Sequence, residues 1–184
     1  MSVFRPPDDW WYKTPVDFEE KVWIGVALVW CLAMFAAMVG WAVWAKQNPP
    51  KESYRTTPKE FARKAVEFIR ARQAKDAKGS PLFEKGIPVV DVPQGEDGYL
   101  IAKAWAWEPV LRLKKGQPAR IRMSSLDFQH GFSLQPANLN LQILPGYEYV
   151  ATLTPTSAGE FLILCNEFCG KDHHKMVGKI IVTE

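Results

Sequence analysis

The sequence is poor in cysteine and histidine, with only three of each among 184 residues. Three cysteines cannot form the disulfide framework of a small secreted domain. The formal net charge of +3 is mild and does not favour nucleic-acid binding. We find no internal repeat, low-complexity tract, phosphate-binding loop, hydrolase-like nucleophile or carboxylate pair. Any specific chemistry must therefore be sought where the few cysteines and histidines gather.

They gather near the C-terminus, in residues 165–176. This segment carries two thiols, two imidazoles and a thioether within twelve residues. Sulfur ligands combined with imidazole favour copper, zinc or iron–sulfur over hard cations. Cys169, His173 and Met176 have the spacing of the ligand loop in a mononuclear blue-copper site, and His130 is a plausible upstream imidazole. Cys165 is one thiolate too many for that site, whereas two thiolates can bridge two copper ions.

Other interpretations of the same residues remain open. The two loop cysteines with His130 and His173 could form a tetrahedral zinc site, although Met176 would then have no role. The cysteines could also pair as a disulfide in a metal-free protein in an oxidising compartment. His174 lies outside the ligand spacing, so we expect it at the surface or behind a ligand. No C-x-x-C-H sequence is present, and covalent haem is not expected on this chain.

The loop resembles the CuA site of subunit II of haem–copper oxidases, whose pattern is C-x-E-x-C-G-x-x-H-x-x-M. Every position is matched, by Cys165, Glu167, Cys169, Gly170, His173 and Met176. The resemblance implies a binuclear centre of two copper ions, bridged by both thiolates. His130 and His173 would each bind one ion, with Met176 and the main-chain carbonyl of Glu167 as weak axial ligands. In many relatives this glutamate also binds magnesium through its carboxylate, at the contact with the catalytic subunit.

The function implied is that of an electron-transfer subunit of a membrane cytochrome c oxidase. The chain would take electrons from a cytochrome c or a small cupredoxin and pass them to haem in catalytic subunit I. That subunit would reduce O2 to water and translocate protons. Trp105 and Trp107 stand where the family keeps aromatic residues for the uptake of electrons, and alternation along a strand would place both indoles on one face. The same module in a nitric oxide reductase, or a non-catalytic tethered copper- or zinc-binding module, are the alternatives.

The N-terminal part predicts a single-pass membrane protein. Residues 22–45 contain no charge, and 24 helical residues span roughly 36 Å, enough to cross a bilayer. Residues 1–21 are net acidic, unlike the leader of a signal peptide, and include the interfacial aromatics Trp10, Trp11 and Tyr12. We expect Cys31 to pack or face lipid. One helix, entered by Glu20, Lys21 and Trp23, resembles the short subunit II of B-family oxidases.

Orientation gives conflicting indications. Lys and Arg are more frequent after the helix than before it, which taken alone favours a cytoplasmic domain. The resemblance instead places residues 1–21 in the cytoplasm and the copper domain outside, in the membrane of a bacterial or archaeal cell. We follow the resemblance in this prediction.

Residues 46–85 are predicted to be a linker containing an amphipathic helix. Thr57, Pro58 and Glu60 form a helix start, and helical spacing continues to about Ala77. The polar face of this helix is basic, so it is either solvated or lies on anionic lipid headgroups.

Residues 86–184 have the short apolar runs and Gly/Pro turns of an antiparallel Greek-key β-sandwich, and the resemblance makes this a mainly β, cupredoxin-like fold. The predicted strands are Val89–Val92, Tyr99–Trp105, Val110–Leu113, Ala119–Ser125, Phe132–Leu134, Gln142–Leu144, Glu148–Thr154, Gly159–Cys165 and Gly178–Val182.

Overall fold

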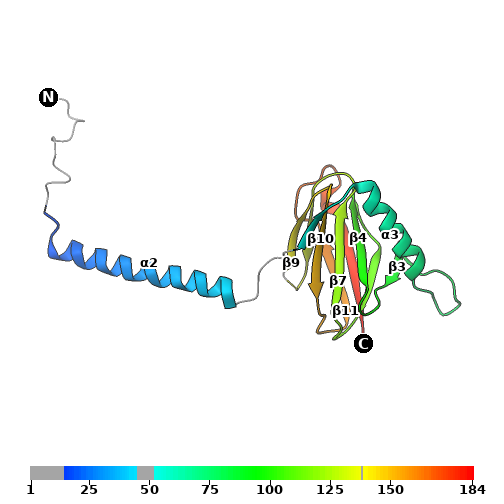
Figure 1. Cartoon of the computed structure of the whole chain (residues 1–184), viewed down its shortest axis with the longest axis horizontal. Coiled ribbons are helices and arrows are strands. Elements are labelled where there is room, and N and C mark those ends of the chain that lie inside the picture. Colours follow the sequence, from blue (N-terminus) through cyan, green and yellow to red (C-terminus); the bar gives the residue numbers. More distant parts are fainter. Residues whose placement is uncertain (1–14, 45–51, 138) are drawn as a thin grey trace, which may run out of the picture. The chain divides into compact units, whose positions relative to one another are not determined.

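A computed structural model describes residues 15–44, 52–137 and 139–184 (Figure 1). The chain divides into two compact units, Met1–Asn48 and Pro49–Glu184. The predicted interfacial residues Trp10, Trp11 and Tyr12, and most of the spacer that follows the apolar run, lie outside the described residues.

The first unit contains helix α2 (Phe18–Trp44). It starts at a reciprocal cap, in which the Glu20 N–H donates to Asp17 Oδ1 at 2.8 Å and the Asp17 N–H donates to Glu20 Oε2 at 3.3 Å. None of its residues is buried within the chain, although they are predominantly apolar. Among the described residues it is the one helix long and apolar enough to cross a membrane, as judged by length and composition. Cys31 is exposed on it.

The second unit is a sandwich of two sheets. The five-stranded sheet has, in spatial order, β1 (Glu52–Arg55), β10 (Tyr147–Leu153), β7 (Ala119–Ser125), β4 (Asp97–Lys103) and β5 (Ala106–Glu108). The seven-stranded sheet has β2 (Phe83–Glu84), β3 (Ile87–Asp91), β6 (Val110–Lys114), β12 (Val177–Thr183), β11 (Gly159–Leu164), β8 (His130–Leu134) and β9 (Leu139–Ile143).

All nine predicted strands are present, with ends shifted by a few residues. The sheets are mixed, however, and not purely antiparallel as predicted. Strand β6 runs parallel to β3 and β12, and β4 runs parallel to β7. Strands β1, β2 and β5 were not predicted, because they are short and lack a clear apolar alternation.

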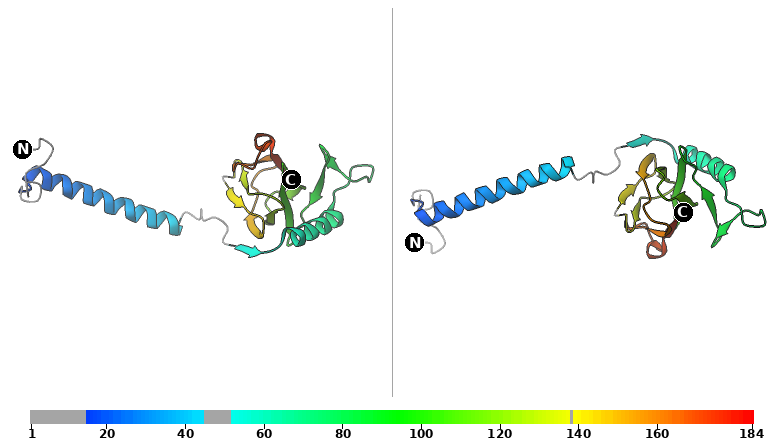
Figure 2. Two further views of the ribbon diagram at one scale, coloured as in Figure 1. Left: turned by 90° about the horizontal axis from the view of Figure 1, so that it is seen from above. Right: turned by 90° about the horizontal axis from the view of Figure 1, so that it is seen from below.

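Residues 52–85 belong to this unit and are not a free linker. Strand β1 pairs with β10, and helix α3 (Pro58–Arg72) packs beside β4 and β3 (Figures 1 and 2). The predicted start of α3 is confirmed, since Thr57 Oγ1 accepts the Glu60 N–H at 3.2 Å. The helix ends at Arg72 and not near Ala77, because the next residues pair with β3 and the Ala74 N–H donates to the Val89 carbonyl at 2.8 Å.

The core between the sheets extends to the end of the sandwich where the predicted ligands lie. Trp107, Phe132 and Met123 are among its largest buried side chains. His130 and Met176 are equally buried, at 0% and 1% exposure. These two predicted ligands are therefore parts of the packed core, and not additions to the surface.

Candidate metal centre

The loop with the two cysteines connects neighbouring antiparallel strands. Cys165 follows the last residue of β11, and Met176 precedes the first residue of β12. The Cys165 N–H donates to the Met176 carbonyl at 3.2 Å, so the β11–β12 ladder closes the loop at its base. Within the loop, a short 3₁₀ turn (η1, His173–Lys175) begins at His173, whose Nδ1 lies 3.5 Å from Cys169 Sγ. The predicted ligands from Cys165 to Met176 thus lie on one loop whose two ends are joined by backbone hydrogen bonds.

His130 comes from a different strand, as predicted. It is the first residue of β8, which pairs with β11 and so stands beside the loop. The following residue, Gly131, allows the approach. A β-carbon there would lie 2.0 Å from Asn166 Oδ1 and 2.7 Å from the Glu167 nitrogen, closer than atoms can approach. Only glycine at position 131 leaves room for Asn166 and Glu167 of the loop to pass this close to β8.

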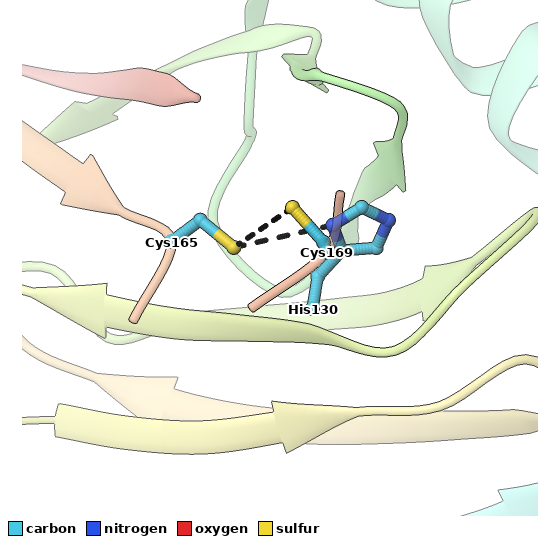
Figure 3. A group of neighbouring side chains, drawn as sticks. All are labelled: His130, Cys165 and Cys169. Carbon is cyan, nitrogen blue, oxygen red and sulfur yellow. Dashed lines mark hydrogen bonds between the residues drawn. The ribbon is translucent and has the colours of Figure 1, made fainter. Parts of the chain in front are cut away.

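The ligand atoms of His130, Cys165 and Cys169 all lie within 4.8 Å of one another (Figure 3). The two thiol sulfurs are 3.6 Å apart, and Cys165 Sγ is 4.0 Å from His130 Nδ1. In Figure 3 dashed lines join Cys165 Sγ to Cys169 Sγ and to the His130 ring. The structure therefore brings together residues that are 35 positions apart in the sequence.

Each thiol has its own set of neighbours. Cys165 Sγ lies 3.2 Å from the Glu167 carbonyl oxygen, in addition to His130. Cys169 Sγ lies 3.5 Å from His173 Nδ1 and 3.8 Å from Met176 Sδ. All six predicted ligands are thus within contact distance of one thiol or the other. Each thiol has one imidazole nitrogen and one weak donor beside it.

Asp127 holds His130 from behind. Its Oδ1 lies 2.8 Å from His130 Nε2, so the ring presents Nδ1 to the thiols. Burial alone would raise the Asp127 pKa, but hydrogen bonds from His130 and from the Ala104 and Phe128 N–H groups outweigh it and lower the pKa. A carboxylate behind a ligating imidazole fixes the ring orientation and strengthens it as a donor. Sequence reasoning did not assign this role, although the D-F-Q-H spacing is a signal for it.

The Cys169 thiol is buried, and this affects its protonation in the metal-free protein. Burial and the neighbouring Cys165 raise the pKa of Cys169 to about 11. Because thiolate is the form that binds a metal, the ion must displace this proton when it binds. The two close sulfurs lie against core residues, a setting that would suit a soft cation.

The two tryptophans predicted to take up electrons lie in different surroundings. A turn at Ala104–Trp105 separates β4 from β5, so the prediction that both indoles share one strand face is wrong. The half-buried Trp105 donates from Nε1 to the Cys169 carbonyl at 3.1 Å. Trp107 is 1% exposed and packs edge-on against Phe132 and His130. Trp105 touches the ligand loop, and Trp107 supports the strand ligand.

The remaining side chains near the loop have lesser contacts. His174 is exposed, on the outside of the turn that carries His173. The Glu167 carboxylate accepts a hydrogen bond from the Gln129 amide at 3.2 Å. Phe168 is 82% exposed and its ring lies 5.8 Å from that of His173.

The donor set fits copper. Thiolate, imidazole and thioether are the ligands that soft and borderline metals prefer, and hard cations such as magnesium and calcium prefer oxygen. All four strong donors are buried or half-buried and surrounded by core residues. A Cys/His cluster of this kind, in this surrounding, suggests copper binding.

No protein-family model matches the chain. Among curated proteins, it is 33% identical to cytochrome c oxidase subunit 2 of Thermus thermophilus over 87 residues, which are 47% of this chain and 64% of that relative. It is 31% identical over 108 residues to a probable cytochrome c oxidase subunit 2 of Streptomyces coelicolor, covering 58% of this chain and 31% of the relative. The chain thus spans less than two thirds of the length of either relative.

A solved structure extends the likeness to most of the chain. A chain in the cryo-EM structure of a haem–copper terminal oxidase dimer matches with a TM-score of 0.57 and 23% identity, covering 90% of this chain and 99% of that one. At this identity the match establishes the fold, which is the expected mainly β, cupredoxin-like sandwich with one N-terminal apolar helix. The chain is thus similar in sequence to subunit 2 of cytochrome c oxidases, and in fold to a chain of a haem–copper terminal oxidase.

Proposed function

We propose that the chain is the electron-transfer subunit of a membrane terminal oxidase. In this proposal the six clustered donors hold a binuclear CuA centre of two copper ions. The subunit receives electrons from a cytochrome c or a small cupredoxin. It passes them to haem in catalytic subunit I, where O2 is reduced to water and protons are translocated. The oxygen chemistry belongs to that other subunit.

The observation that carries the proposal is the pairing of donors around the two sulfurs. The thiols stand 3.6 Å apart, and each has its own imidazole and its own weak donor. A single tetrahedral zinc ion needs only the two thiolates and two imidazoles. Such a zinc ion would not use the Met176 thioether or the Glu167 carbonyl as ligands. Two copper ions use all six donors.

Bound copper would supply a one-electron redox couple. The protein's own contribution is to hold the donors still. His130 is completely buried in a strand, and the loop ends are joined by the β11–β12 ladder. Packed interiors resist displacement, so the donors have little freedom to rearrange when the charge of the site changes. A small rearrangement is what rapid electron transfer over a small driving force requires.

Trp105 is the residue we propose for the uptake of electrons, in preference to Trp107. Its indole is half-buried and its N–H bonds to the Cys169 carbonyl at 3.1 Å, which connects the surface to a ligand through one hydrogen bond. Trp105→Phe should therefore slow the reduction of the centre by its donor and leave copper content unchanged. Stopped-flow reduction measures this, with Trp44→Phe on α2 as a control for tryptophan loss. An unchanged rate would exclude Trp105 from the route.

The membrane arrangement follows from α2. We propose that α2 spans the membrane of a bacterial or archaeal cell once, with the sandwich on the outer side. There the domain would meet its electron donor and would contact catalytic subunit I along the membrane. The Glu167 carboxylate, held by Gln129, is the candidate magnesium ligand at that contact.

The test is copper loading of the purified full chain. We expect two copper ions per chain by elemental analysis and a seven-line electron paramagnetic resonance pattern, from one unpaired electron shared by two copper nuclei. Reduction by a cytochrome c should abolish the pattern. One zinc ion per chain without visible absorption would overturn the proposal in favour of a structural metal module.

A further inference from the structure

Helix α3 has two faces of opposite character. Phe61, Ala65 and Phe68 are buried against the sandwich, where the rings of Phe61 and Phe68 each lie 5.7 Å from that of Tyr99. A second helical stripe consists of residues 59, 63, 66 and 70. It begins two positions before the buried stripe, which consists of residues 61, 65 and 68. At 100° per residue this displacement places them on the opposite side of the helix. All four are exposed.

This outer face is basic around one apolar side chain. It consists of Lys59, Arg63 and Arg70 around Val66, which is 41% exposed, and we call it the basic face of α3. Arg63 pairs with Glu67 at 2.8 Å. Within the described residues, neither Lys59 nor Arg70 has an ion-pair partner. A helix that needs only its inner face for folding thus presents cations that the fold does not use.

The position of α3 in the chain gives this face a nearby target. Seven residues, 45–51, join α2 to β1, and an extended segment of that length spans roughly 25 Å. Strand β1 is fastened to the sandwich, and α3 begins three residues after β1 ends. If α2 crosses a membrane, the surface of that membrane is held near the domain at a high effective concentration.

We propose that the basic face of α3 docks on anionic phospholipid headgroups of the membrane that α2 crosses. This inference rests on the membrane anchor of the proposed function. Anionic headgroups complement Lys59, Arg63 and Arg70, and Val66 at the centre suits the boundary between headgroups and acyl chains. An acidic protein partner would meet the same cations, but the short tether to α2 favours the lipid surface. Docking would also give a role to Lys59 and Arg63, two of the basic residues that follow α2.

The expected strength follows from the number of charges. Each Lys or Arg near an anionic surface favours binding by about fivefold, so the three together contribute about a hundredfold. Because Arg63 is already paired with Glu67, we expect at least a tenfold effect from the three. Interactions of this kind extend about 10 Å at 0.1 M salt and about 3 Å at 1 M, so the docking should be salt-sensitive.

The test is photocrosslinking on the full, copper-loaded chain in nanodiscs. The photoreactive amino acid p-benzoyl-L-phenylalanine replaces Val66, and lipid adducts are counted by mass spectrometry. Nanodiscs with equal amounts of phosphatidylglycerol and phosphatidylcholine should give adducts at 66, and pure phosphatidylcholine should give at least tenfold fewer. Salt at about 1 M should suppress them too. The same photoreactive residue at Phe83, which is 55% exposed on β2, controls for random collision with lipid.

A charge-matched pair of variants separates this face from net charge. The triple change Lys59→Gln, Arg63→Gln and Arg70→Gln should lower the adduct yield at least tenfold. Removing the exposed Lys75, Lys78 and Lys85 in the same way should leave it within about twofold. Equal losses from both triples, equal yields in neutral lipid, or adducts to protein instead of lipid would each overturn the inference.

The proposed function is read separately in the same sample. An intact seven-line signal without lipid adducts would refute the docking and leave the copper proposal standing. Lipid adducts without the copper signal would support the docking and count against the copper proposal. A chain that fails to remain with the nanodisc would overturn the membrane anchor and the docking together.

Discussion

The candidate centre has two halves that are built differently. The strand half is His130, held in β8 between the Asp127 carboxylate and the core, with Gly131 beneath the crossing loop. The loop half is residues 165–176, which supplies five donors and is fixed by its ends and by the hydrogen bond from Trp105. The strand half has one ligand and several supports, whereas the loop half has many ligands and few supports.

This difference predicts how each half should respond to substitution. In the loop half a single change removes a donor directly. In the strand half, changes to residues that never touch the metal should still move or weaken a ligand, because His130 depends on its neighbours for its orientation. The four substitutions below test that contrast, from the largest expected effect to the smallest.

Cys169→Ser should have the largest effect, because it removes a thiolate from the loop half. A hydroxyl is a poor substitute for sulfur toward copper. We expect fewer than two copper ions per chain and no seven-line signal. Cytochrome-driven turnover should fall by more than about a hundredfold, which exceeds the usual loss of activity when a residue that supports a metal ligand is replaced. Cys31→Ser, on the exposed surface of α2, is the matched control and should change none of these. Unchanged turnover in the Cys169 variant would contradict the assignment.

Asp127→Asn should have the next largest effect, although Asp127 is not a ligand. The amide keeps the shape but loses the charge that holds His130 Nε2, so copper affinity should fall about 10–100-fold. Competition with a copper chelator measures the affinity. Glu160→Gln, which removes a carboxylate paired with Lys179 on the surface, serves as the control. If both variants bind copper equally well, Asp127 contributes only to folding.

Gly131→Ala tests whether the two halves must approach this closely. The added methyl group would overlap Asn166 and the Glu167 backbone, and forcing it in should destabilise the protein by about 1–3 kcal/mol in urea unfolding. Adding Asn166→Ala should recover part of the loss, since it removes the 2.0 Å contact but not the backbone one.

Gly98→Ala is a control for Gly131→Ala, because the three atoms nearest to a β-carbon there all belong to the Val92 side chain, the closest at 3.0 Å, and none of the three is backbone. We expect this control to cost less and to leave copper binding intact. Equal destabilisation by the two alanines would show that the close crossing at Gly131 is not special.

Met176→Leu should have the smallest effect on assembly. Leucine has nearly the volume of methionine and position 176 is buried, so stability should change by less than about 1.5 kcal/mol. Both copper ions should remain, and the midpoint potential should shift, because a weak axial ligand tunes the site without holding it. Redox titration followed by electron paramagnetic resonance measures the shift. Loss of copper would show that the loop half depends on Met176 more than we propose.

Several features could be predicted from the sequence because they depend on neighbouring residues. The cap at Thr57 is local, and so are the apolar periodicity of the strands and the spacing of the sulfur donors. Features that depend on pairing between distant segments could not. Helix α3 ends at Arg72 because the Ala74 N–H forms its hydrogen bond with Val89 of β3 and not within the helix. Trp105 lies in a turn just before β5, and the alternation of residues along a strand does not reveal this turn.

The sequence by itself determined which atoms can bind a metal, because side-chain chemistry and the spacing within one short loop are covalent properties. It also determined the apolar helix, whose long uncharged run from residue 22 needs no partner to be recognised. Only the tertiary structure decided that His130 meets Cys165, that Asp127 holds it, and that Gly131 lets the loop pass. The reason is that β8 and β11 become neighbours only when the sheet forms, and residues 35 positions apart then share one pocket.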